Sequence, residues 1–445
     1  MRLEITPGAA ADAELVARVD DALPAGEIER DANELRVGAL DGWGADALRA
    51  AAAAVARARR RAGGDIVWRA GDEDEVRALV EGTAYGAYDA GLRKRAYRDR
   101  NDLTLVIDGH EKLRPFAERQ ALVGRHLARA RDLANLPPNE LTPPALADHA
   151  ARLDLPHLAA ESLGREEIVS LGMGAFAAVA QASGHDPRLI VLRYDPPGAR
   201  GETTLGLVGK AITFDSGGIS LKPHLRMQDM KGDMAGGAAV IEGLAAVAEI
   251  GLPVRVVGVV AATENLQGAR AFKPGDILRA MNGKTIEIMN TDAEGRLLLA
   301  DALHYARDQG ATHVADFATL TGAMVLALGD LYAGFFANDE DWARELEAAA
   351  ETSGDLVWRF PLHPRYRRYI DSAFADMKNG SALREGAPVL AAEFLREFAG
   401  DGPWAHVDMA GPGFVRRRRP DYVLDEGGTG YGVRLIVELA ARLAA

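Results

Sequence analysis

The chain has 445 residues, of which 48% are hydrophobic and 26% are charged, and its net charge is −13. This length is enough for two domains with sizeable cores, and the composition is that of a globular protein. The acidic balance argues against general nucleic-acid binding, and the absence of cysteine excludes disulfides and fits a reducing cytoplasm. No apolar run approaches the roughly 18 residues that a membrane-spanning helix needs, and the N-terminus lacks the pattern of a secretory signal.

Residues 1–125 are predicted to form a small α/β domain, because strands and helices alternate along them. The expected strands lie at 2–6, 65–68 and 103–108, and the expected helices lie at 45–62 and 73–90. A further helix at 116–134 runs into LPPNELTPP, whose prolines end it. Residues 126–150 are therefore expected to link two domains.

Residues 151–445 are predicted to form a larger, doubly wound α/β domain with a mixed sheet. The runs at 188–194 and 203–208 are apolar enough to be buried parallel strands. Further strands are expected at 255–262, 285–289 and 313–317, and helices at 236–250, 296–309 and 430–443.

An octapeptide, NTDAEGRL at 290–297, stands where one of these strands turns into a helix. It places Asp292, Glu294 and Arg296 at the corner, and ligands in open α/β sheets bind outside the carboxyl ends of strands. The alternative is a solvated turn whose acids cap the helix N-terminus. The octapeptide alone does not decide between them.

Two upstream stretches add more charged residues at strand ends and glycine-rich turns. GKAITFDSGGISLKP at 209–223 and MKGDMAGG at 230–237 contain Lys210, Asp215, Lys222 and Asp233. Four converging carboxylates would repel and raise one another's pKa values, and a pair of divalent metal ions removes that cost. The alternative is that these acids never meet and that each pairs with a surface Lys or Arg.

These motifs resemble those of the leucyl aminopeptidase family, the cytosolic dimetal aminopeptidases. The resemblance runs from about residue 130 to the C-terminus, and the N-terminal domain contributes little to it. Besides the three stretches above, it rests on ARDLANLPPN, ATEN, KPGDI, ATLTGA and WAHVDMAG.

The resemblance implies two divalent ions, zinc or manganese, in each subunit. Asp215 and Glu294 would bridge both ions, Asp292 would belong to one, and Lys210 and Asp233 would belong to the other. A lysine can bind a metal only as the neutral amine, and the alternative for Lys210 is a plain ion pair with Asp215.

The same resemblance gives catalytic roles to two cations that are not ligands. Lys222 would stabilise the tetrahedral oxyanion formed when a peptide bond is hydrolysed. Arg296 would hold a bicarbonate ion that acts as general base on the metal-bridging water. The alternative for each is a structural salt bridge.

Four further positions align with those that line the family's first side-chain pocket, namely Met230, Thr319, Gly322 and Ala410. Small and apolar groups suit a leucine-like side chain, although these residues could instead pack the core beneath the site. Gly413 stands where some relatives have a bulkier residue, which would widen the pocket. Residues 416–428 depart from the usual short link and are expected to reshape its rim.

The sequence therefore predicts a cytoplasmic metallo-aminopeptidase that removes a leucine-like N-terminal residue from short peptides. The family implies a homohexamer, a dimer of trimers whose sites face an enclosed cavity. The alternatives are a Cys-Gly or other dipeptidase on the same site, and a DNA-binding architectural protein with secondary peptidase activity. The acidic balance opposes the last, so neither nucleic acid nor membrane is expected as a partner.

Overall fold

The computed structural model describes residues 2–6, 9, 15–31, 34–38, 42, 44–91, 102–199, 201–381, 385–419, 421–423 and 425–444. The chain divides into two compact units. Unit 1 comprises Met1–Ala128 and Arg417–Glu426, and unit 2 comprises Arg129–Arg416 and Gly427–Ala445. The sequence-based boundaries at 125 and 151 kept residues 417–426 with the larger domain, whereas this division assigns them to unit 1.

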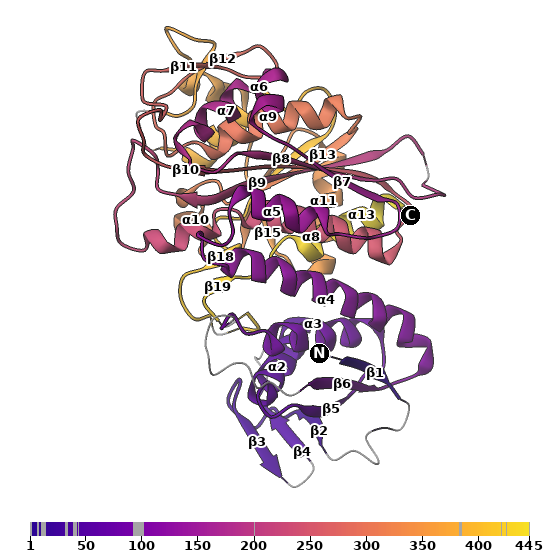
Figure 1. Cartoon of the computed structure of the whole chain (residues 1–445). Helices are drawn as coiled ribbons and strands as arrows, with labels where there is room; N and C mark the ends of the chain where they lie inside the picture. The colour runs from indigo at the N-terminus through magenta and orange to yellow at the C-terminus, as the bar shows by residue number, and fades with distance from the viewer. Residues whose placement is uncertain are drawn as a thin grey trace. The chain divides into compact units, whose positions relative to one another are not determined.

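Unit 1 is built on one sheet with the strand order β1-β6-β5-β2-β4-β3 (Figure 1). The strands are β1 (Arg2–Ile5), β2 (Val16–Val19), β3 (Ile28–Asp31), β4 (Glu34–Val37), β5 (Gly64–Arg69) and β6 (Leu103–Asp108). All neighbouring pairs are parallel except β3 and β4. The predicted small α/β domain is thus confirmed, although β2, β3 and β4 were not predicted.

Helices α2 (Ala45–Arg59) and α3 (Glu73–Ala87) lie close together in unit 1. A Cβ atom at Gly82 would lie 2.2 Å from the Arg49 carbonyl oxygen, and one at Gly86 would lie 2.1 Å from the Ala53 carbonyl oxygen. Glycines on α3 facing an alanine-rich α2 therefore allow the two backbones to touch. Helix α4 (Arg114–Asn135) follows and leads into unit 2.

Unit 2 contains an eight-stranded mixed sheet in the order β15-β14-β17-β13-β9-β10-β8-β7. Its strands are β7 (Leu158–Leu163), β8 (Arg188–Tyr194), β9 (Thr204–Asp215), β10 (Arg255–Asn265), β13 (His313–Ala318), β14 (Ala333–Ala337), β15 (Val357–Arg359) and β17 (Trp404–Asp408). The central strands β10, β9, β13 and β17 are parallel. Strand β8 runs antiparallel to both of its neighbours, which corrects the expectation of a parallel strand there.

Helices cover both faces of this sheet (Figure 1). Helices α8 (Ala235–Ile250) and α13 (Val433–Ala444) lie on one face, and α7 (Gly174–Val179) and α9 (Gly295–Asp308) lie on the other. The remaining helices of unit 2 are α5 (Pro143–Ala151), α6 (Arg165–Ser170), α10 (Gly322–Leu328), α11 (Glu340–Ser353) and α12 (Ala387–Arg396). The doubly wound, mixed-sheet prediction is confirmed.

Two small sheets complete unit 2. One joins β11 (Ile277–Arg279), β12 (Thr285–Glu287) and β16 (Met377–Lys378), and the other joins β18 (Phe414–Val415) and β19 (Gly427–Gly428). Across the described residues, no helix combines the length and the apolar character required to cross a bilayer.

The parallel strands at the centre of the sheet end at one edge, and three of them end in polar residues. Asp215 is the last residue of β9, Asn265 of β10 and Asp408 of β17. Carboxyl ends of parallel strands are where α/β sheets bind ligands. The fold therefore gathers these side chains at one place.

Candidate metal centre

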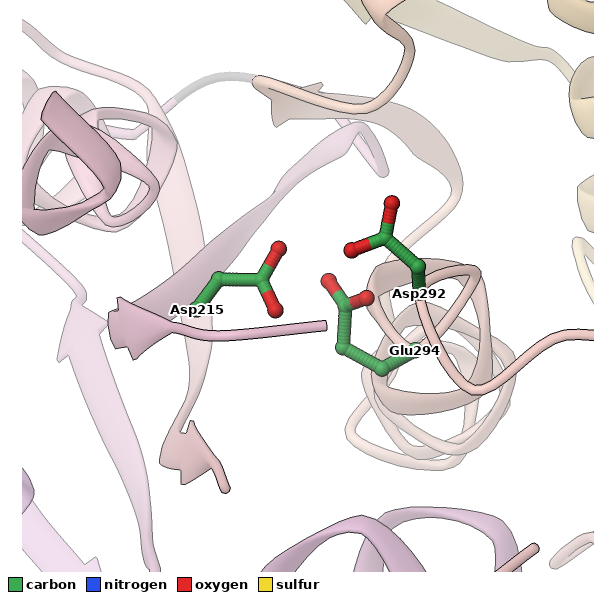
Figure 2. Close-up of side chains that lie close together, drawn as sticks. All are labelled: Asp215, Asp292 and Glu294. Atoms are coloured by element: carbon green, nitrogen blue, oxygen red, sulfur yellow. The ribbon is translucent and has the colours of Figure 1, made fainter. Parts of the chain in front are cut away.

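Three carboxylates from two distant segments face one another at this edge (Figure 2). Asp215 comes from the end of β9, and Asp292 and Glu294 come from the turn that leads into α9. Each offers an oxygen, and these oxygens lie within 4.8 Å of one another. The fourth predicted acid, Asp233, precedes α8, and it lines a pocket together with these three carboxylates.

Two lysines are interleaved with the four acids. Lys210 Nζ lies 2.7 Å from Asp233 Oδ2 and 3.0 Å from Glu294 Oε1. Lys222 Nζ lies 2.8 Å from Asp215 Oδ2 and 2.5 Å from Asp292 Oδ1. The four acids thus meet in one cluster, and the ion pair considered for Lys210 with Asp215 is made by Lys222 instead.

The glycine of the octapeptide makes room for one of these lysines. A Cβ atom on Gly295 would lie 2.6 Å from Lys210 Cε and 2.7 Å from its Nζ. Real Cβ contacts are not that short, so a larger residue at position 295 would displace the lysine from the cluster. This contact explains why a glycine stands between Glu294 and Arg296.

Burial disfavours the charged forms of the carboxyl groups in the cluster. The side chains of Asp215 and Glu294 are 2% and 1% exposed. Burial, and then the charge of Asp215, raise the pKa of Glu294 to about 8, and burial raises that of Asp233 to about 6. Burial alone would lower the pKa of Lys210, but the charges of Asp233 and Glu294 raise it overall.

This donor set fits divalent cations. A cluster in which a buried glutamate keeps its proton near neutral pH is short of positive charge, and divalent ions supply it. Carboxylate oxygens suit hard or borderline divalent ions. Lys210 would need to lose its proton to act as a ligand, which an ion beside it would favour.

Asn265 ties the cluster together, and sequence reasoning gave it no role. Its Nδ2 donates to Asp215 Oδ1 at 2.8 Å and to the Thr291 carbonyl oxygen at 3.0 Å, and it lies 3.4 Å from Glu294 Oε2. The Gly217 N–H also donates to Asp215 Oδ1, at 2.9 Å. Asn265 belongs to the ATEN motif, but an isolated asparagine carries no signal for this contact.

Arg296 is buried near the start of α9 and lines the same pocket. Its Nη1 donates to the Asn379 carbonyl oxygen at 2.7 Å, while its buried Nε has no hydrogen-bond partner among the described residues. Burial lowers the pKa of Arg296 to about 10, so the group stays charged at neutral pH. A buried guanidinium with an unused donor is suited to an anion.

A pocket of about 230 Å³ opens beside the cluster. Met230, Thr319, Gly322 and Ala410 all line it, and none of the four is buried. The Thr319 hydroxyl donates to Asp233 Oδ1 at 2.7 Å, which joins the pocket wall to the acidic cluster. These residues therefore form a surface rather than a core beneath the site.

Further residues line the pocket, including the first residue of the segment 416–428, which was predicted to reshape its rim. Phe414 and Arg416 line it, whereas Gly413 is buried and does not. A Cβ atom at Gly413 would lie 2.8 Å from Met409 Cε, so this glycine serves packing rather than pocket width. Asp408 positions the far wall by accepting from the Leu320 N–H at 3.1 Å and from the Thr321 hydroxyl at 2.6 Å.

The chain matches known proteins over most of its length. Residues 128–437 match the catalytic domain of the cytosol aminopeptidase family. A "Probable cytosol aminopeptidase" of Solibacter usitatus is 46% identical over 368 residues, which cover 82% of this chain and 75% of that protein. One of Koribacter versatilis is 44% identical over 383 residues, covering 83% and 73%.

A solved structure is also similar. The bottromycin maturation enzyme BotP in complex with Mn superposes with a TM-score of 0.86 and 36% sequence identity. The similarity covers 97% of this chain and 100% of that one, so it includes the N-terminal unit.

Proposed function

The chain belongs to the cytosol aminopeptidase family of metal-dependent exopeptidases, and we propose that it removes the N-terminal residue from short peptides with two bound metal ions. The observation that carries this proposal is the meeting of four carboxylates and Lys210 at the carboxyl edge of the sheet. The ions would be zinc or manganese, and the manganese complex of the similar BotP structure supports the second.

The five predicted ligands would divide between the two ions. Asp215 and Glu294 would bridge both, which their central position in the cluster supports. Asp292 would belong to one ion, and Lys210 and Asp233, which lie 2.7 Å apart, would belong to the other. When bound, such a pair of ions supplies a Lewis acid for the scissile carbonyl and lowers the pKa of a shared water.

The chain's own cations would act on the substrate. Lys222 is only partly buried and lines the pocket, so its ammonium group can face the oxyanion of the tetrahedral intermediate. The unused Nε of Arg296 supports its proposed role in holding the bicarbonate base. Asp233 would receive the free α-amine, which restricts the reaction to chain ends.

The pocket formed by Met230, Thr319, Gly322 and Ala410 would bind the first side chain. These four wall residues are mostly small or apolar, which suits a leucine-like group, and they share the pocket of about 230 Å³ with the acidic cluster. The cytoplasm is the proposed location, in keeping with the names of the relatives.

We further propose a homohexamer. Three large apolar side chains are exposed in unit 2: Leu326 of α10 is 90% exposed, Trp358 of β15 is 60% exposed, and Leu225 is 78% exposed. Burying such side chains against another subunit would remove their apolar surface from water, which supports self-association. Light scattering at assay concentration should give six subunits, and an active monomer would refute this assembly.

A panel of amino-acid amides tests the proposed activity. The metal-stripped protein would be reconstituted with zinc, manganese or cobalt and assayed on leucine, methionine, alanine, lysine and glutamate amides, with Cys-Gly as a dipeptide control. Leucine-like amides should be hydrolysed fastest. Turnover of Cys-Gly alone would instead indicate a dipeptidase, and a salt-sensitive gel shift with DNA would indicate a nucleic-acid role.

A further inference from the structure

Arg416 differs from the other cationic residues of the pocket wall in the partners of its side chain. Lys210 and Lys222 are held by the acidic cluster, and Arg296 donates to a backbone carbonyl. Asp229, also in the wall, pairs with Arg226. The side chain of Arg416 is exposed, and within the described part of the chain it forms no hydrogen bond or ion pair.

The backbone that presents Arg416 is held in place. Phe414 and Val415 form β18, which pairs with Gly428 and Gly427 of β19. The Gly428 N–H donates to Asn135 Oδ1 at 3.0 Å. On the other side, the ring of Phe414 packs against Gly232, where a Cβ atom would lie 2.2 Å from it. Arg416 therefore follows directly on a fixed strand at the pocket wall.

The charges of the loaded pocket favour an anionic ligand. Among its lining residues, five carboxylates stand against four cationic side chains. Two divalent ions would add four positive charges, of which a neutral Lys210 and a bound bicarbonate would offset two, so the loaded pocket would still be positive. Asp215, Asp233 and Glu294 are buried whereas Arg416 is exposed, so positive charge extends to the mouth of the pocket.

The direction of a bound peptide follows from the proposed function, on which this inference rests. Asp233, which is buried and would receive the free amine, lies deep in the pocket, so the residues after the scissile bond must leave through the mouth. An exposed wall residue therefore meets that part of the substrate. An arginine without a partner is suited to a carboxylate, which it can bind with two parallel hydrogen bonds.

We propose that Arg416 forms a subsite for a carboxylate on the residue that follows the scissile bond. That carboxylate is either an acidic side chain or the free C-terminus of a dipeptide. An exposed ion pair of this kind is typically worth a factor of about 1.5 to 5 in affinity. The preference is expected in KM rather than in kcat, since the contact is the same before and during reaction.

Matched substrate pairs test the proposal. The manganese-loaded enzyme would be assayed on Leu-Glu amide against Leu-Gln amide, and on Leu-Ala against Leu-Ala amide. The acidic member of at least one pair should have the higher kcat/KM, and the ratio should shrink at high salt. An effect in the first pair alone identifies the side chain as the recognised group, and an effect in the second alone identifies the C-terminus.

Three variants separate Arg416 from its surroundings. Arg416→Gln should bring the ratio of kcat/KM values in each pair to about one. Arg416→Glu should lower the ratio below one, and it should hydrolyse Leu-Lys amide better than Leu-Gln amide. Arg418→Gln is the control, because Arg418 is an exposed arginine of the same segment that does not line the pocket, and it should keep the wild-type ratio. A wild-type ratio of one in both pairs, or a ratio unchanged in Arg416→Gln, overturns the subsite. Failure to hydrolyse even Leu-Gln amide refutes the proposed function, and the subsite with it.

Discussion

Replacing Asn265 by alanine should weaken metal binding, although all five proposed metal ligands remain in the variant. The substitution removes a hydrogen bond of 2.8 Å to the carboxylate of Asp215 and one of 3.0 Å to the Thr291 carbonyl. A hydrogen bond to a charged group contributes about 1.5–3 kcal/mol and a neutral one about 0.5–1.5 kcal/mol. The sum of about 2–4.5 kcal/mol is an upper bound, because Asp215 keeps its bonds to Gly217 and Lys222.

The effect should be divided between stability and metal affinity. Loss of a group that orients a metal ligand typically costs about 10- to 100-fold in affinity. Titration calorimetry of manganese into the stripped protein measures this cost, and urea unfolding of the same stripped sample measures stability. Only the second quantity would change if Asn265 were merely structural.

Gln267→Ala provides the matched control. Gln267 also donates from a side-chain amide near the site, to the Gly218 carbonyl at 2.9 Å, but it contacts no acid of the cluster. It should cost about 1 kcal/mol of stability and leave manganese affinity unchanged. If Asn265→Ala bound manganese as tightly as this control, the assigned positioning role would be wrong.

The remaining predictions concern the cluster, its cations and one buried acid. Asp215→Asn and Glu294→Gln should lose bound metal and activity together, so two full metal equivalents in both would exclude bridging. Lys222→Ala should keep its metal but lose about 10²- to 10³-fold in kcat. Bicarbonate removal should slow the wild type but hardly affect Arg296→Ala, and an equal response would remove that residue from base binding. Burial raises the pKa of Asp301 from 3.8 to about 7. Because the folded protein then binds this proton more tightly, its stability should fall as pH rises from about 4 to about 7. Asp301→Asn should flatten that slope in urea unfolding, and an unchanged slope would show that Asp301 does not cause it.

The cluster could be predicted because its charged residues stand in short, contiguous motifs. Asp292 and Glu294 stand two residues apart at a strand-to-helix corner, and Asp215 ends a long apolar strand. Strand ends of one sheet meet at one edge, so residue type and position along an element were enough to bring these acids together.

Strand direction and the position of Phe414 in the pocket wall could not be foreseen in the same way. The apolar run of β8 indicates that both faces of the strand are buried. Helices cover both faces of the sheet whichever way a strand runs. The run therefore did not reveal that β8 pairs antiparallel with its neighbours. The wall at Phe414 depends on β18 pairing with β19 about a dozen residues further on. Two strands of two residues each are too short to show a period.

The main chain passes between the two units three times, once within α4 and twice at the ends of the segment Arg417–Glu426. Tyr422 of that segment is buried in unit 1, where its ring centre lies 4.9 Å from that of Tyr85 and Arg49 lies over its face. A fragment beginning at Arg129 would keep Tyr422 but lose both partners. The N-terminal unit is consequently not a detachable module, since the C-terminal part of the chain supplies a piece of its interior.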